Sequence, residues 1–305
     1  MNIAYHTPVM LHQSVDALCV KPNGVYVDAT FGGGGHAREI VNRLKNGRLI
    51  AFDRDADAGA NRMEDKRFVL IQNNFRFMRG LLRNEGITEV DGVLADLGVS
   101  SHQFDTGERG FSFRFDAPLD MRMARGGALT AAQVVNSYPE TQLCAVLRTY
   151  GEVEHAAYAA KLLAAARERE AITTIGSLKK ALAPCLPKVM EHKYLAKVFQ
   201  ALRIEVNGEM RALEQLLAQA LKVLKPGGRL VVITYHSLED RLVKNFMRAG
   251  NTEGKIEKDM FGKGMTPFTV ITKKAIVPEE NEIQQNTRAR SAKLRVAEKN
   301  KDGRS

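Results

Sequence analysis

The side chains of this sequence that could do chemistry stand where short apolar runs end. Asp28, Asp53 and Asp96 each close such a run, and His236 follows another. If the runs are parallel strands of one sheet, their carboxyl ends meet at one edge, where such sheets bind ligands. The carboxylates could accept hydrogen bonds from hydroxyl or amino groups there, and the histidine could relay a proton. A structural role for His236 is an equally good interpretation.

Four glycines, Gly32 to Gly35, follow the first of these acids, and a helical pattern then runs from about residue 37 to 44. Glycines in such a turn let the backbone approach a ligand closely, where a Cβ would clash. The acid that ends the next strand, Asp53, lies about 20 residues beyond the turn, where a carboxylate can accept both hydroxyls of an adenosine ribose. The pattern predicts an adenosine-containing cofactor; a merely flexible turn is the alternative.

The glycine pattern alone does not identify the cofactor, because Gly32-x-Gly34-x-x-Ala37 also fits the loose dinucleotide fingerprint. Two details favour S-adenosylmethionine over NAD. Asp28 would face the pyrophosphate of a dinucleotide, but it could accept a hydrogen bond from a cationic amino-acid group. His36 follows the glycines in place of a plain apolar helix start. S-adenosylmethionine carries an ammonium and a sulfonium and no phosphate.

Asp96 is the candidate for the reaction chemistry. An acid at this position suits methylation of an exocyclic amine such as that of cytosine. This amine is a poor nucleophile, and an acceptor that holds its hydrogens helps it to attack a methyl carbon in line. An aspartate that binds backbone amides at the start of a loop is the alternative. The Pro-Pro-aromatic sequence of DNA amino-methyltransferases is missing after this acid. A ring that stacks on the base must then come from elsewhere, with Phe104, Phe111 and Phe113 as candidates that are equally expected in the core.

Two further motifs have structural explanations. Pro184-Cys185 has the form of the nucleophile of cytosine C5 methyltransferases, but it falls in a helical region, and we interpret Cys185 as a buried thiol near a helix end. Ser237 and Asp240 have the spacing of a capping box. That interpretation leaves the neighbouring His236 near the ligand edge.

The apolar runs predict an open α/β sheet. The expected strands are 25–27, 49–52, 68–71, 90–95, 229–235, 268–273 and 293–297. From about Thr130 to Val206 only helical segments occur, with Thr130 and Thr141 as expected N-caps. We therefore predict an α/β fold, a doubly wound Rossmann-like sheet with an all-helical domain inserted after the fourth strand. The expected boundaries are residues 1–115 and 207–305 for the two halves of the α/β domain and 116–206 for the insert.

The composition favours a polyanionic partner. The 305 residues carry a formal net charge of +10, and 44% are hydrophobic, which is enough for one large domain or two modest ones. Such a basic balance suggests nucleic acid, and a basic surface with no partner is the alternative. Near the end of the chain, Arg288, Arg290, Lys293 and Arg295 could hold phosphates or lie on a solvated strand.

The cysteines and the apolar segments indicate the compartment. Cys19, Cys144 and Cys185 lie far apart and form neither a metal-binding pattern nor a disulfide framework, so we expect no metal. No segment approaches the length of a membrane span, and the first residues lack the apolar core of a secretory signal. These features predict a protein of the reducing cytoplasm, without a membrane partner.

Taken in order, the motifs resemble those of one family. They are HTPVML from His6, DATFGGGGH from Asp28, AFDRD around Asp53, DLGVSS from Asp96, ERGFSFR, PLDMRM, YHSLEDR and RARSAKLR. The combination spans nearly the whole chain and is far more specific than a glycine loop. The chain is similar to the bacterial small-subunit (16S) ribosomal RNA cytosine-N4 methyltransferases. It departs from them at Ala29, where the family often has glycine, and at Thr287, where proline is usual.

This resemblance implies an enzyme with the Rossmann-like methyltransferase fold and an inserted helical domain that recognises the substrate. It implies cofactor contacts from Gly34, Gly35 and His36, from Asp53 to the ribose, from Phe75 near the adenine, and from Asp96 and Gln103. The implied target is a decoding-centre cytidine of small-subunit ribosomal RNA, on an assembled or nearly assembled small ribosomal subunit. The oligomeric state, a homodimer included, stays open.

Three other functions are kept as alternatives: a DNA amino-methyltransferase, an NAD-dependent oxidoreductase, and an inactive RNA-binding protein with a methyltransferase fold. Duplex DNA as a substrate tests the first. Binding of S-adenosylmethionine compared with NAD tests the second, and a methyl-transfer assay tests the third.

Overall fold

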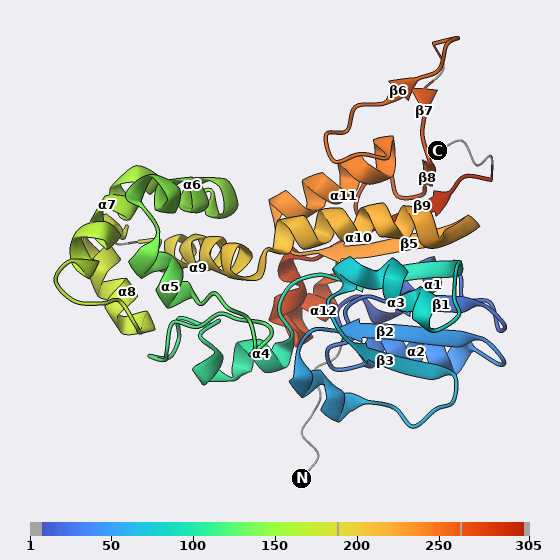
Figure 1. Cartoon of the computed structure of the whole chain (residues 1–305), viewed down its shortest axis with the longest axis horizontal. Helices are drawn as coiled ribbons and strands as arrows, with labels where there is room; N and C mark the ends of the chain where they lie inside the picture. Colours follow the sequence, from blue (N-terminus) through green and yellow to red (C-terminus); the bar gives the residue numbers. More distant parts are fainter. Residues whose placement is uncertain (1–7, 188, 263, 302–305) are drawn as a thin grey trace. The chain divides into compact units, whose positions relative to one another are not determined.

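The computed structural model describes residues 8–187, 189–262 and 264–301, so His6 and Thr7 of the first motif lie outside the described residues (Figure 1). The chain forms two compact units. One holds the residues up to Gly98 and those from Arg211 onward, and the other runs from Val99 to Met210. The second unit begins earlier than residue 116, where the sequence placed the insert.

The first unit is built on a seven-stranded sheet with the strand order β3-β2-β1-β4-β5-β9-β8 (Figure 1). Its strands are β1 (Val25–Asp28), β2 (Arg48–Asp53), β3 (Phe68–Gln72), β4 (Val90–Asp96), β5 (Leu224–Thr234), β8 (Phe268–Val270) and β9 (Lys293–Lys299). Strands β1 to β5 pair in parallel, whereas β9 pairs antiparallel with both β5 and β8. The strand order reverses between β1 and β4, which makes the carboxyl ends of these two strands the expected ligand-binding point.

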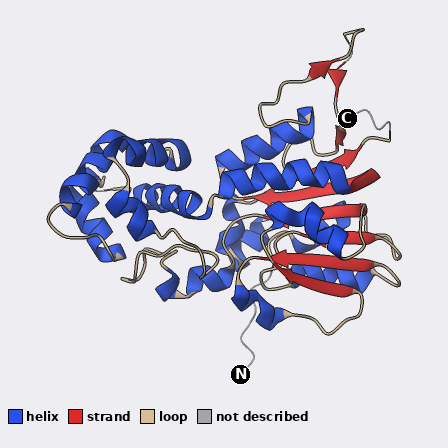
Figure 2. Ribbon diagram, viewed as in Figure 1, coloured by secondary structure: helices blue, strands red, loops and turns tan. Residues whose placement is uncertain are grey.

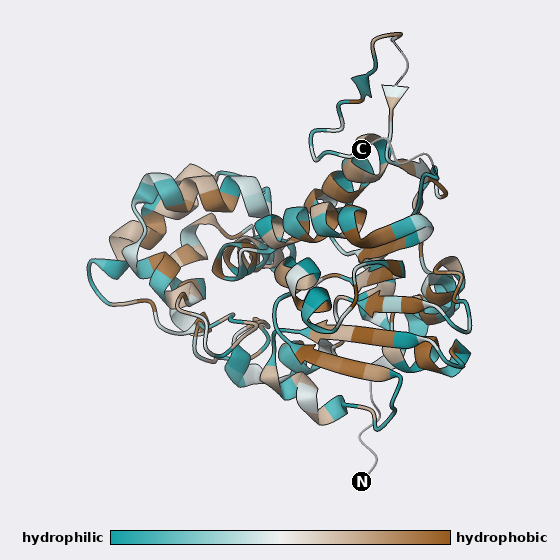
Figure 3. Cartoon of the chain, turned by 45° about the vertical axis from the view of Figure 1, so that its right-hand side comes forward, coloured by the Kyte–Doolittle hydropathy of each residue, from teal (hydrophilic) through white to brown (hydrophobic). Residues whose placement is uncertain are grey.

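The parallel strands are apolar because they are covered on both faces. The middle residues of β2 and β4 are buried without interruption, and Figure 3 shows these strands as hydrophobic ribbons. The helices of this unit are α1 (Leu11–Ala17), α2 (Gly35–Arg43), α3 (Met78–Asn84), α10 (Glu209–Val223), α11 (Ser237–Ala249) and α12 (Glu280–Gln285). Helix α2 packs against β2, and α11 packs against β8 and β9. Among the described residues, none of the helices has the length and apolar character that a membrane crossing requires.

The second unit is helical, as predicted (Figure 2). Its helices are α4 (Ser101–Asp105), α5 (Ala131–Ser137), α6 (Glu140–Gly151), α7 (Ala156–Arg167), α8 (Ile175–Leu182) and α9 (Glu191–Asn207). They enclose a core of their own. Buried Arg109 donates hydrogen bonds to the carbonyl oxygens of Arg122 and Met123, at 3.0 and 2.8 Å. The ERGFSFR and PLDMRM motifs therefore hold each other in place within this unit.

Some expected boundaries differ from the structure. Thr130 caps α5 through a full capping box, but α6 begins at Glu140 after Pro139, so the prediction that Thr141 is an N-cap was wrong. Proline suits a helix start because its missing N–H would have no partner there. A short hairpin formed by β6 (Glu257–Lys258) and β7 (Gly264–Met265) was not predicted. Its strands have two residues each and are exposed, so they form no apolar run.

Candidate functional site

Three acids lie where the sequence predicted, at the carboxyl ends of neighbouring parallel strands. Asp28 is the last residue of β1, Asp53 of β2 and Asp96 of β4. The register pairs Asp28 with Ala51 on one side and with Leu94 on the other, so the three strand ends lie at the same edge of the sheet. This edge is the candidate site.

The glycine loop between β1 and α2 supplies backbone to this edge. Gly34 precedes the first residue of α2 and has a φ of +75°, a conformation that side chains disfavour. A Cβ on Gly35 would lie 1.9 Å from Cγ of Pro8. Gly35 is thus required for packing of the N-terminal segment against the start of α2, a reason that the sequence did not reveal.

His36, in the first turn of α2, is a buried and neutral side chain. Its Nε2 lies 3.1 Å from the carbonyl oxygen of Val9. Because a carbonyl oxygen can only accept, Nε2 carries the proton and Nδ1 is left as an acceptor. Burial lowers the pKa of His36 to about 4, so the ring stays neutral at physiological pH.

Asp53 occupies the position expected for a ribose-binding acid. Its Oδ2 accepts from the backbone N–H of Gly32, and its Oδ1 accepts from the N–H of Asp55, each at 2.8 Å. These bonds orient the carboxylate and still leave lone pairs for two hydroxyl donors. Burial raises the pKa of Asp53 above its ordinary value.

A pocket lies beside Asp53 in the same unit. Its lining residues are Asp53, Asp55, Gly59, Arg62, Leu70 and Gln72. Among these residues, only Asp53 was predicted from the sequence to belong to the site. A signal for Gln72 was present, because it directly follows the apolar run of the strand next to β2. Asp55 caps the short 3-10 helix η1 (Ala56–Asn61), and its carboxylate accepts from the N–H of Asp57.

Asp28 offers an acceptor at the floor of the site. It is fully buried, and its Oδ1 accepts from the N–H of Thr30 at 3.0 Å. Its Oδ2 has no hydrogen-bond partner among the described residues. Burial raises the pKa of Asp28 to about 7, since a charge without a partner is costly there. An ammonium group beside Oδ2 would satisfy this atom, so the residues fit the amino-acid end of S-adenosylmethionine and not a pyrophosphate.

Asp96 is tied into the same network. Its N–H donates to Oγ1 of Thr30, and its Oδ1 accepts from the hydroxyl of Tyr235, both at 2.7 Å. Its Oδ2 lies 3.9 Å from Nδ1 of His36. Burial, with a smaller contribution from the negative charge of Asp28, raises the pKa of Asp96 to about 7, although the hydrogen bond from Tyr235 lowers it. Tyr235 was not predicted from the sequence as a site residue.

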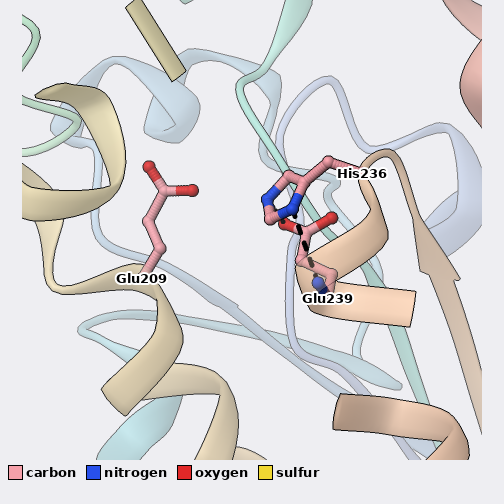
Figure 4. Close-up of side chains that lie close together, drawn as sticks. All are labelled: Glu209, His236 and Glu239. Carbon is pink, nitrogen blue, oxygen red and sulfur yellow. Dashed lines mark hydrogen bonds and ion pairs between the residues drawn. The ribbon is translucent and has the colours of Figure 1, made fainter. Parts of the chain in front are cut away.

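The second candidate for catalysis, His236, has a structural task. It is the N-cap of α11, and its Nδ1 accepts from the N–H of Glu239 at 3.4 Å, while its Nε2 lies 3.1 Å from Oε1 of Glu239 (Figure 4). The predicted capping box of Ser237 and Asp240 was therefore wrong. Asp240 instead accepts from the guanidinium of Arg295 at 2.6 Å. A catalytic role for His236 stays a prediction without geometric support.

The remaining predicted residues lie in several places. Phe75 starts the 3-10 helix η2 (Phe75–Phe77) after β3 and is half-buried. Gln103 belongs to the helical unit, where its side chain completes the capping box of α4 and donates to the carbonyl oxygen of Met123 at 3.4 Å. Their contacts with a cofactor stay predictions.

The three candidate stacking rings belong to the core of the helical unit. Phe111 is buried in that core, and Phe104 and Phe113 pack against it. Phe113 meets Phe199 edge to face, with ring centroids 5.3 Å apart. These positions favour the core interpretation of all three.

The thiol and the basic segment also have structural partners. Cys185 is half-buried just after α8, and its Sγ lies 3.1 Å from the carbonyl oxygen of Leu182. Arg295 is buried in its pair with Asp240, and Lys293 lies 3.4 Å from the same carboxylate. The ion pair with Asp240 gives Arg295 a structural role. Arg290, in contrast, is exposed to solvent.

Comparison with known proteins shows the family of the chain. The model of the MraW methylase family matches residues 3–300. The chain is 54% identical over 299 residues to ribosomal RNA small subunit methyltransferase H of Bacteroides thetaiotaomicron, covering 98% of each chain. It is 56% identical over 291 residues to the protein of the same name from Flavobacterium psychrophilum, covering 95% of this chain and 100% of the relative. The chain therefore belongs to the MraW methylase family and is an enzyme, a methyltransferase that uses S-adenosylmethionine.

Proposed function

We propose that this enzyme methylates the exocyclic N4 of one cytidine in the decoding centre of small-subunit ribosomal RNA. The names of its relatives support ribosomal RNA of the small subunit as the substrate class. The observation that supports N4 as the methylated atom is the carboxylate of Asp96, at the switch point of the sheet. Its Oδ1 accepts a hydrogen bond from Tyr235, whereas its Oδ2 has no hydrogen-bond donor among the described residues and could accept from an amine.

The cofactor would occupy the edge formed by β1 and β2. Oδ2 of Asp28 would accept from its ammonium group, and Asp53 would accept from its ribose hydroxyls. The pocket beside Asp53, whose lining includes Gln72 and Arg62, would take the adenine side. When bound, S-adenosylmethionine supplies a methyl group that its sulfonium makes electrophilic.

Asp96 would act on the target amine. Its Oδ2 would accept one N4 hydrogen, which turns the nitrogen lone pair toward the methyl carbon and holds the amine in line. As the bond from N4 to carbon forms and the bond from sulfur to carbon breaks, N4 must lose one hydrogen as a proton. The ionised carboxylate of Asp96, which would already accept this hydrogen, can take that proton, and a carboxyl whose pKa is raised to about 7 suits the task.

The setting of the reaction follows from the substrate. We infer that the enzyme acts in the cytoplasm on an assembled or nearly assembled small subunit, with the helical unit from Val99 to Met210 contributing to recognition of the particle. The target base must leave its stack to reach the edge of the sheet.

Mass spectrometry of nucleosides from small-subunit ribosomal RNA tests the proposal. Cells without the gene should lack one N4-methylcytidine that cells with the gene contain. A copy of the gene with Asp96→Ala should fail to restore this nucleoside, and a copy with Asp16→Ala, an exposed acid on α1, should restore it. An unchanged N4-methylcytidine content without the gene would refute the proposal.

A further inference from the structure

Tyr235, between the end of β5 and the start of α11, touches the acid on which the proposed reaction depends. We propose that Tyr235 is a positioning residue for methyl transfer: its hydroxyl orients Asp96 and keeps that carboxylate ionised, so that Oδ2 is presented to the target amine. This inference rests on the role of Asp96 in the proposed function.

The tyrosine is held at three points. Its N–H donates to Oε2 of Glu239 at 2.9 Å, which fixes its backbone to the first turn of α11. Its ring packs over Gly98, where a Cβ would lie 3.4 Å from Cδ2 of the ring. Its hydroxyl donates to Oδ1 of Asp96 at 2.7 Å. These three contacts fix the side chain with its hydroxyl group directed toward the carboxylate of Asp96.

The two oxygens of Asp96 are thereby given different tasks. Oδ1 is engaged by the tyrosine. Oδ2 lies 3.9 Å from Nδ1 of His36, which is beyond hydrogen-bond distance, and that nitrogen is itself an acceptor. A donor brought to Oδ2 therefore displaces no bond seen among the described residues. The amine of a cytosine is such a donor.

The charges around Asp96 make this hydrogen bond important. Four groups face it: Asp28 on β1, His36 on α2, Tyr235, and Glu239 on α11. His36 is neutral, whereas burial, and to a smaller extent the charges of both acids, opposes ionisation of Asp96. Tyr235 alone among these four favours the ionised form. Burial, together with the nearby acids, Glu282 on α12 included, raises the pKa of the tyrosine well above its ordinary value, so it stays a donor at any pH used in an assay.

The variant Tyr235→Phe tests the inference through the pH dependence of methyl transfer. Transfer needs ionised Asp96, so the rate should rise with pH, and the pH at half-maximal rate reports the ionisation. Without the hydroxyl, the neutral carboxyl is favoured, and this midpoint should move upward by about one pH unit or more. For a shift of one unit, the rate should fall by about fivefold at the midpoint of the unchanged enzyme and by about tenfold well below it, and at high pH the two rates should converge.

The matched control is Tyr26→Phe. This tyrosine, on β1, is fully buried, and its hydroxyl binds the backbone at Lys21 and Cys19, away from Asp96. Its loss should leave the midpoint in place. Calorimetric binding of S-adenosylmethionine verifies that each variant is folded, and it should be little changed for Tyr235→Phe.

A loss of rate that is equal at every pH, or an unmoved midpoint, would contradict the inference. If Tyr235→Phe does not fold, 3-fluorotyrosine placed at this position provides the test, because its hydroxyl is a stronger donor and should move the midpoint to lower pH. An unmoved midpoint there also overturns the inference. The proposed function fails separately: a product other than N4-methylcytidine refutes it whatever the midpoint does, whereas that product with an unmoved midpoint refutes only the role of Tyr235.

Discussion

Thr30 connects the two acids that are expected to meet the cofactor and the amine. Its N–H donates to Asp28, and its hydroxyl oxygen accepts from the N–H of Asp96. Burial raises the pKa values of both carboxyls to about 7, and nearby negative charges contribute, Asp53 for Asp28 and Asp28 for Asp96. A cation bound beside Asp28 would lower both pKa values, so cofactor binding would also prepare Asp96 to accept a hydrogen.

The residue that should dominate cofactor affinity is Asp53. In Asp53→Ala both ribose hydroxyl bonds are lost, and hydrogen bonds to a charged group contribute roughly 1.5–3 kcal/mol each. The dissociation constant for S-adenosylmethionine should rise at least about tenfold. Isothermal titration calorimetry measures it, with Asp16→Ala, which removes an exposed acid, as the control. Unchanged affinity of a folded Asp53→Ala protein would remove this residue from the site.

Cys185 should be dispensable for catalysis. Attack by an exocyclic amine forms no covalent bond between enzyme and base, unlike C5 chemistry, so Cys185→Ser should keep its methyl-transfer rate. The half-buried position of the thiol against the Leu182 carbonyl oxygen tolerates a hydroxyl donor. A folded but inactive serine variant, or a covalent adduct trapped with a fluorinated cytosine in the RNA, would show that the N4 assignment is wrong.

The site acids were predictable from sequence, and their partners were not. An acid that directly follows an apolar run marks the end of a strand, so Asp28, Asp53 and Asp96 could be assigned to one edge. The bond between Tyr235 and Asp96 joins residues 139 positions apart, and no local pattern carries that information.

Secondary-structure elements were predictable to the extent that burial decides them. The central parallel strands are covered on both faces and therefore form apolar runs. The hairpin of β6 and β7 is exposed and was missed. The N-cap of α11 was misassigned by one residue. Ser237 was expected to be the N-cap, but His236 is, and its ring accepts the hydrogen bond from the backbone of the first turn.

The cap of α5 offers a test at this scale. The Thr130 hydroxyl accepts from the N–H of Gln133, and Thr130→Ala should lower the free energy of unfolding of the helical unit by about 1 kcal/mol. Thr141→Ala is the matched control, because this exposed threonine lies inside α6. It should be neutral or stabilising by up to about 0.5 kcal/mol, since alanine favours helix. Urea unfolding measures both, and an equal loss in the two variants would contradict the assignment of the caps.

At the scale of the whole molecule, the positive charge is unevenly divided. Residues 99–210 hold 14 of the 45 basic and 12 of the 35 acidic side chains, so only +2 of the net +10 lies in the helical unit. The α/β unit therefore carries most of the charge that attracts RNA backbone, and the helical unit is better suited to recognising shape.

This division predicts a salt effect. About a fourfold increase in salt concentration should raise the KM for small ribosomal subunits at least about tenfold, because phosphate contacts release counterions. The dissociation constant of S-adenosylmethionine, a small ligand that carries no phosphate, should change little. Initial rates over a range of particle concentrations, beside calorimetry in the same buffers, separate the two effects. A KM that does not respond to salt would refute the electrostatic account of docking.

The identity of the product tests the central claim most directly. Purified enzyme, labelled S-adenosylmethionine and small subunits from cells that lack the gene should place the label in N4-methylcytidine, at one site of the RNA. Free cytidine should react poorly because nothing but the particle holds the base at the edge of the sheet, and the Asp96→Ala enzyme should give little product. Label in 5-methylcytidine, in a ribose methyl group or in protein would contradict the account.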